Sequence, residues 1–155
     1  MERLRYDEDK AFFLADDAST IARIVRTIPA DRLRATKFDE WTVLEIIGHV
    51  ADADEIFADR VQRCVDEDRP GVAAYDQDAV AKEHRNNERD PMDLSRRLSA
   101  AHSRIIQLLQ RPGAAARPGR HSDWGEVDAG HFAAYQADHS HGHTSELAKA
   151  FPPTF

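Results

Sequence analysis

Three histidines in this sequence have the spacing of metal ligands. His139 and His143 lie four residues apart in the segment ADHSHGHTSEL. In a helix such residues project from one face about one turn apart, so both imidazoles could bind one ion. A third ligand must then come from elsewhere in the fold, and His49 in WTVLEIIGHVADADE is the obvious candidate. Neutral imidazole suits zinc, nickel, copper and iron, so the residues indicate a metal without identifying it.

Two carboxylates lie about one helical turn beyond these histidines. Asp52 follows His49 by three residues, and Glu146 follows His143 by three. A metal site that activates water would need a nearby carboxylate as base, which makes Asp52 and Glu146 the candidate catalytic residues. The alternative, which we favour, is that both orient the imidazoles or form surface ion pairs.

Other polar residues near the predicted site have a structural and a functional interpretation. Arg60 returns to the face of His49 and could contact a substrate carboxylate, although a salt bridge inside the bundle is the interpretation we favour. His121 is expected in a loop, either overhanging the cavity or, as we favour, on the surface. His141 points away from His139 and is expected to be exposed.

Four amphipathic segments are expected to form the helices that position these residues. Their apolar residues recur at spacings of three and four, as helices with one buried face require. The segments span about residues 9–28, 42–67, 90–110 and 127–150. Two longer connections, about 68–89 and 111–126, remain between them, and connections of this length in a small domain usually carry function or cover something.

The second helix has the clearest start. Thr42 is a good N-cap, and Glu45 three residues later completes a capping box. Glu45 is also four residues from His49 and could bind the metal, but the capping box explains it better. At the third helix, Asp90 is expected to cap and Pro91 to occupy the first helical position.

The depth of each histidine in its helix predicts how the helices are arranged. His49 lies seven residues past Thr42, or ~10 Å at ~1.5 Å per residue. The midpoint of His139 and His143 lies nine residues before Ala150, or ~13 Å. These depths agree if the second and fourth helices are antiparallel neighbours. The connection lengths then predict an all-α, up-down-down-up four-helix bundle with one long crossover over residues 68–89.

Composition limits the class of protein. With 155 residues, the chain is expected to form a single domain over residues 1–155. The net charge of -7 argues against a nucleic-acid surface, which needs clustered basic residues. No apolar run is long enough to span a membrane. Cys64 is the only cysteine and lies in an apolar pattern, so we expect it to be buried, in a soluble cytoplasmic protein.

The order of these motifs resembles the DinB/YfiT-like metalloprotein superfamily. The resemblance rests on W-T-V-x-E-I-x-x-H-V-x-D at residues 41–52, followed by H-x-x-x-H near the C-terminus, and covers nearly the whole chain in helix order. It implies a four-helix bundle that binds one divalent ion, such as zinc, nickel, iron or manganese, through His49, His139 and His143. It also implies a homodimer. Gly142 departs from many relatives, which have a polar residue or histidine before the last ligand, and leaves more space there.

The resemblance also implies the chemistry. Some members transfer groups to a low-molecular-weight thiol such as bacillithiol or mycothiol, and others are described as metal-dependent hydrolases. We therefore expect a metalloenzyme with a small-molecule substrate, thiol S-transfer being favoured over hydrolysis. The alternative is a non-catalytic stress protein that binds a structural metal or a ligand. A di-iron site would need E-x-x-H motifs, and the sequence contains none.

Overall fold

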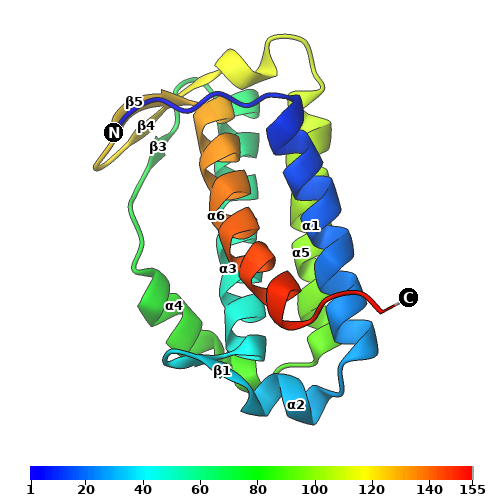
Figure 1. Cartoon of the computed structure of the whole chain (residues 1–155). Coiled ribbons are helices and arrows are strands. Elements are labelled where there is room, and N and C mark those ends of the chain that lie inside the picture. Colours follow the sequence, from blue (N-terminus) through cyan, green and yellow to red (C-terminus); the bar gives the residue numbers. More distant parts are fainter. Residues whose placement is uncertain (155) are drawn as a thin grey trace.

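Four long helices form the body of the protein in a computed structural model that describes residues 1–154 (Figure 1). They are α1 (Glu8–Thr27), α3 (Val43–Asp66), α5 (Pro91–Leu109) and α6 (Ala129–Ala150). Each lies within two residues of a segment predicted from the apolar spacing. Two short α-helices, α2 (Ala30–Ala35) and α4 (Gln77–His84), and the 3-10 turns η1 (Asn86–Glu88) and η2 (Ala114–Ala116) lie in the connections.

The helices run up-down-down-up, as the sequence predicts. In Figure 1, α1 and α6 start at the top of the bundle, and α3 and α5 start at the bottom. Each of α1 and α6 therefore runs antiparallel to both α3 and α5, and α3 and α6 pack against each other. The segment between α3 and α5, which includes α4, returns along the full length of the bundle and is the predicted crossover.

Side-chain caps determine where α3, α5 and α6 begin. The Thr42 hydroxyl accepts a hydrogen bond from the Glu45 backbone N–H, and the Glu45 carboxylate accepts one from the Thr42 backbone N–H. The capping box is thus confirmed. Asp90 caps α5 with Pro91 in the first turn, and Asp128 caps α6 by accepting a hydrogen bond from the His131 N–H. These caps fix the depth of each downstream side chain in its helix.

Two small sheets, which the sequence analysis did not predict, occupy the connections. Strands β1 (Lys37–Phe38) and β2 (Trp41–Thr42) form an antiparallel hairpin before α3. Strands β3 (Gly71–Val72), β4 (Pro118–His121) and β5 (Gly125–Asp128) form a second sheet in the order β3-β4-β5. Because β3 pairs with β4, this sheet joins the two long connections at one end of the bundle.

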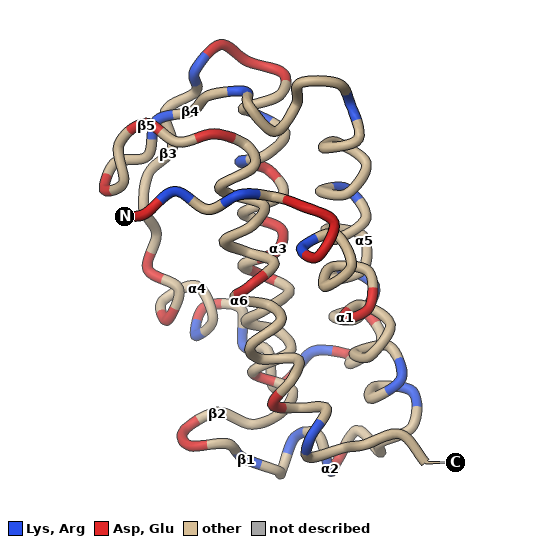
Figure 2. The backbone as a smooth tube through the Cα atoms, turned by 45° about the horizontal axis from the view of Figure 1, so that its top comes forward, with Lys and Arg blue, Asp and Glu red and all other residues tan. Residues whose placement is uncertain are grey.

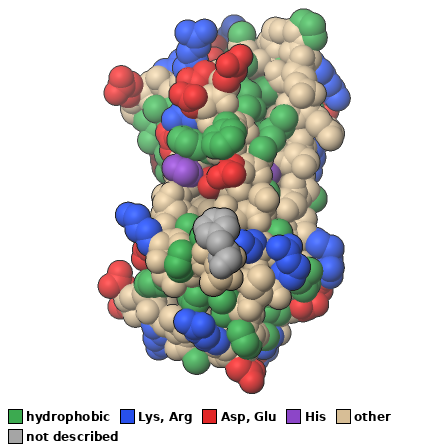
Figure 3. Space-filling view, turned by 45° about the vertical axis from the view of Figure 1, so that its right-hand side comes forward, with side chains coloured by type: hydrophobic (Ala, Val, Ile, Leu, Met, Phe, Trp, Pro, Cys, Tyr) green, Lys and Arg blue, Asp and Glu red, His purple; other side chains and the backbone are tan. Residues whose placement is uncertain are grey.

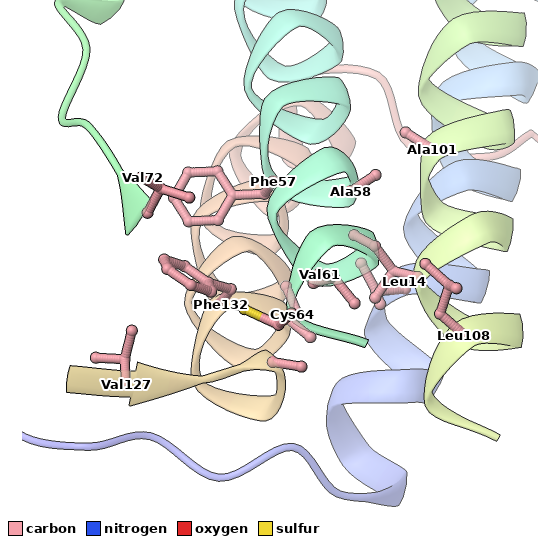
Figure 4. Packing of buried hydrophobic residues seen from close by; sticks show 14 residues of the cluster. Leu14, Phe57, Ala58, Val61, Cys64, Val72, Ala101, Leu108, Val127 and Phe132 are labelled. Atoms are coloured by element: carbon pink, nitrogen blue, oxygen red, sulfur yellow. The ribbon is translucent and has the colours of Figure 1, made fainter. Parts of the chain in front are cut away.

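The hydrophobic core has two parts. One contains Phe57, Cys64 and Phe132 and lies toward the three-stranded sheet; Figure 4 shows the two phenylalanines side by side. The other lies toward α2 and is built around aliphatic residues such as Ile47 and Leu98. Cys64 is buried as expected, and burial raises the pKa of its thiol to about 11. A layer of polar side chains on the helices separates the two parts, and the predicted ligands lie in it.

The outside of the bundle carries both signs of charge. Lys and Arg are interspersed with Asp and Glu along the helices (Figure 2), and the face seen in Figure 3 mixes charged and hydrophobic side chains. Among residues 1–154, no helix has the length and apolar character needed to cross a membrane.

Candidate metal centre

His49, His139 and His143 lie together in the polar layer. Each offers a ring nitrogen, and these three atoms lie within 4.8 Å of one another. The Nε2 atoms of His49 and His139 are 3.2 Å apart. The centroids of the three rings lie 4.9–5.3 Å apart, and each pair of ring planes is nearly perpendicular. The antiparallel packing of α3 and α6 thus brings the three histidines together as the depth comparison predicted.

The geometry of this cluster fits a divalent ion. Two nitrogens that each bind zinc at about 2.0–2.1 Å in a tetrahedron lie about 3.3 Å apart, close to the observed Nε2 separation of 3.2 Å. Burial, together with the neighbouring imidazoles, lowers the pKa of both His49 and His139 to about 4. Burial also lowers the pKa of His143, partly opposed by the Glu146 charge. The rings are therefore neutral at pH 7, as metal ligands must be.

A chain of buried polar groups orients His139. Its Nδ1 lies 3.3 Å from the Gln136 Oε1, and the Gln136 Nε2 donates to the Asp54 carboxylate at 2.6 Å. The other Asp54 oxygen lies 2.8 Å from the His102 Nε2, and the His102 Nδ1 lies 2.7 Å from the Leu14 carbonyl oxygen. Because the Gln136 oxygen can only accept, His139 carries its proton on Nδ1 and directs the Nε2 lone pair at the cluster.

The contact between Asp54 and His102 lies in the middle of this chain. Both residues are fully buried. Burial raises the pKa of Asp54, whereas for His102 the lowering by burial is outweighed by the adjacent Asp54 charge, so the pKa of His102 is also raised. The Asp54 carboxylate thus combines an ion-pair contact with His102 through one oxygen and a hydrogen bond accepted from Gln136 through the other. This pair was not predicted from the sequence, where its only signal is a polar residue in the apolar stripe of each helix.

Both carboxylate oxygens of Asp52 have hydrogen-bonding partners other than the three histidines. Its carboxylate contacts His84 Nδ1 at 2.8 Å, Arg97 Nη2 at 2.8 Å and Asn86 Nδ2 at 3.0 Å. Its side chain is 2% exposed. Asp52 therefore attaches the end of the crossover to α3 and α5. A role as general base remains a prediction, and the orienting role that we favoured would have to act through the backbone of α3.

Glu146 lies at the outer edge of the cluster. It is exposed and lines a surface groove of about 410 Å³ together with His143, Trp41 and Phe38. The Trp41 ring also contacts His49 edge-on, with 4.8 Å between centroids. The β1–β2 hairpin therefore forms one wall of the approach to the histidines. Of the two predicted catalytic carboxylates, Glu146 is the one that solvent and a small molecule can reach.

Three other predicted positions differ from the expectations. His141 is half-buried, because it stacks on Phe13 at 3.8 Å and contacts the Asp17 carboxylate. His121 is buried rather than on the surface, because β4 carries it inward onto the Trp124 ring. Arg60 is buried but forms no ion pair with a carboxylate among residues 1–154, so the expected salt bridge is absent there.

Comparisons with known proteins agree with this architecture. A model of the DinB superfamily matches residues 14–147. The solved structure of YfiT from Bacillus subtilis, described as a probable metal-dependent hydrolase with an unusual four-helix bundle topology, superposes with a TM-score of 0.75. The two chains are 19% identical, and the match covers 99% of this chain and 94% of that one. At this identity, the similarity establishes the fold. No curated protein sequence matches the chain.

Proposed function

The chain belongs to the DinB superfamily, and from this premise we propose that it is an enzyme dependent on one divalent metal ion held by His49, His139 and His143. The observation that carries the proposal is the convergence of three neutral imidazoles beside accessible space. Three protein ligands leave coordination positions for a substrate, which distinguishes catalytic from closed structural sites. The ion would supply Lewis acidity, lowering the pKa of a thiol or water and polarising an electrophile.

The reaction we favour is transfer of a group to a low-molecular-weight thiol. A thiol that loses its proton to solvent needs no protein base, and Asp52, the more buried candidate base, already has three hydrogen-bonding partners. In this reaction the thiol sulfur forms a bond to an electrophilic carbon of the substrate, and the leaving group departs with the bonding electrons. The protein's own part is to orient the His139 imidazole through Gln136 and to hold the substrate.

Hydrolysis is the second candidate, supported by the position of Glu146. An exposed carboxylate one turn from His143 could accept a proton from water at the rim of the site. The structural relative YfiT is described as a probable hydrolase, which is consistent with this reading. Glu146→Gln separates the two reactions, because it should reduce hydrolysis and leave thiol transfer largely unchanged.

Metal removal and reconstitution test the proposal. The metal-free protein should retain its far-UV circular dichroism, because two hydrophobic cores flank the site, and should lose activity with a thiol and a chloronitrobenzene or nitrophenyl ester. Zinc, nickel, manganese or ferrous iron should restore that activity. His143→Ala should remain inactive, whereas His141→Ala, two residues away on the same helix, should be active.

Two results would contradict the proposal. Activity in the metal-free protein or in His143→Ala that equals that of the metal-loaded, unaltered protein would show that the histidine site is not catalytic. Collapse of the helices on metal removal, without any turnover by the loaded protein, would instead support the alternative, a stress protein with a structural metal.

A further inference from the structure

A second cavity reaches the histidine cluster from the side of the three-stranded sheet. It has a volume of about 200 Å³ and is lined by His139 and Gln136 at one part and by Arg60, Tyr75, Trp124 and Tyr135 at others. Drug-sized ligands usually need about 300 Å³ or more, so this cavity suits a smaller molecule. It therefore connects a metal ligand to a group of aromatic rings and one cationic side chain.

Arg60 is an unusual residue to line such a cavity, because it is a buried cation without an ion-pair partner among the described residues. The residue is 6% exposed, and its Nη2 donates to the Ala73 carbonyl oxygen at 2.7 Å. Its guanidinium carbon lies 4.8 Å from the centre of the Phe57 ring and 5.5 Å from that of Tyr75. Within the described part of the chain, its only hydrogen bond is the one to Ala73, and no carboxylate lies within ion-pair distance.

This leaves a buried positive charge with spare donors. A guanidinium has five N–H groups, and it remains protonated in proteins. Cation–π contacts offset part of the cost of removing it from water, but they satisfy none of its hydrogen-bond donors. Burial lowers the pKa of Arg60, and the nearby charge partners are tyrosines rather than acids. An anion that entered the cavity would supply the missing acceptors, and carboxylate matches the guanidinium fork.

The other residues that line the cavity suit the apolar part of a ligand. The Trp124 ring lies 4.8 Å from Tyr135, and Phe57 stacks on Tyr135 at 5.3 Å. His121 stacks on Trp124 at 4.2 Å and is buried, so it adds a flat face rather than a charge. Burial lowers the pKa of His121, which keeps the ring neutral at pH 7. Asp123, the acidic residue of the lining, is exposed and lies outside ion-pair distance of Arg60.

We propose that this cavity binds a small carboxylate with a flat apolar body, its carboxylate on Arg60, its body between Tyr75, Trp124 and Tyr135, and its far end toward His139. This assigns a substrate class to the proposed metalloenzyme and rests on that function for its catalytic meaning. Binding itself depends on residues outside the metal cluster, so it can be measured without any metal.

The test uses the whole 155-residue chain without metal and two probes of the same shape. Phenylacetate carries the carboxylate, and phenylacetamide is its neutral counterpart. Titrations are followed by the indole N–H signal of Trp124 in a two-dimensional NMR spectrum and by calorimetry. We expect phenylacetate to shift this signal and to bind at least tenfold more tightly than the amide, because a charged carboxylate pairs with the guanidinium whereas an amide does not.

Variants assign the effect to Arg60. Arg60→Met keeps much of the packing and should weaken phenylacetate at least tenfold while leaving the amide unchanged. Arg63→Met, one turn further along α3 at an exposed ion pair with Glu67, is the matched control and should bind as the unaltered protein does. Should Arg60→Met fail to fold, Arg60→Lys, which keeps the charge without the fork, should show an intermediate affinity.

Each contrary result overturns the proposal. These are no binding of phenylacetate, equal binding of acid and amide, calorimetric binding that leaves the Trp124 signal unshifted, or equal loss of affinity in Arg60→Met and Arg63→Met. None of these results bears on zinc binding by the three histidines, so failure of the carboxylate site and failure of the metal site are distinguishable.

Discussion

Gln136→Leu tests whether the buried polar chain orients a metal ligand. Gln136 is fully buried between the His139 Nδ1, at 3.3 Å from its oxygen, and the Asp54 carboxylate, at 2.6 Å from its nitrogen. Leucine has a similar volume but accepts no hydrogen bond, so His139 loses the partner that fixes its tautomer. Loss of such a partner typically costs 10–100-fold in metal affinity, or about 1.4–2.7 kcal/mol. The free energy of unfolding should also fall by about 1–3 kcal/mol, because Asp54 loses a donor.

Zinc affinity is measured by competition with a chromophoric chelator at pH 7.5, and stability by urea denaturation of the metal-free protein. Ser140→Ala is the control, because Ser140 is equally buried on α6 but contacts His102 at 3.2 Å instead of His139. It should lower stability by about 1 kcal/mol and change zinc affinity less than twofold. Unaltered zinc affinity in Gln136→Leu, or equal losses in both variants, would refute the orienting role.

Three further predictions concern pH, the crossover and a close helix contact. Because the pKa values of His49 and His139 are lowered to about 4 in the fold, the unfolded chain binds more protons between pH 6.5 and 4. The free energy of unfolding of the metal-free protein, measured by urea denaturation at several pH values, should therefore fall by roughly 2–4 kcal/mol as pH is lowered through that window. A free energy of unfolding that does not change with pH would contradict this. Asp52→Ala should lower the free energy of unfolding, measured by thermal denaturation, by about 2–4 kcal/mol, because the crossover loses its attachment to α3 and α5. The variant should bind as much metal as the unaltered protein; loss of metal would indicate that Asp52 acts at the metal site itself. Gly48→Ala places a Cβ 2.2 Å from Cγ and 2.4 Å from Cβ of Asn86 and should lower the free energy of unfolding by about 1–3 kcal/mol. Asn86→Gly in the same chain removes both atoms and should partly restore stability relative to Asn86→Gly alone; no such rescue would refute the contact.

The sequence was sufficient to predict the helices and the convergence of three histidines, because both depend on local spacing. Apolar residues at intervals of three and four predicted each long helix, and the Thr42 cap fixed how far along α3 His49 lies. Antiparallel packing then matched this depth to that of His139 and His143. These relations need only the geometry of one helix and the sense of its neighbour.

The polar chain behind His139 could not be predicted in this way. Asp54, His102 and Gln136 come from three different helices, and their contacts depend on how those helices rotate against one another. A polar residue within an apolar stripe is a recognisable signal, but it does not identify its partner. Asp52 illustrates the same limit, because its partners His84 and Asn86 lie in the crossover.

The cavity around Arg60 depends on the three-stranded sheet, which has strands of two to four residues. Strands this short carry too little alternation to be recognised, and β3 pairs with β4 across a long separation in the sequence. That pairing brings His121 and Trp124 over the side of the bundle. The expected surface position of His121 and the expected salt bridge of Arg60 were therefore wrong, because long-range strand pairing, rather than helical spacing, determines what surrounds these two side chains.

Metal content is the most direct test of the three-histidine site. Protein purified without added metal, loaded with zinc and desalted should hold close to one ion per chain by mass spectrometry. His49→Ala, which removes the ligand contributed by α3, should hold almost none, whereas His141→Ala should hold as much as the unaltered protein. Equal zinc in His49→Ala and in the unaltered protein would show that the ion does not bind between α3 and α6.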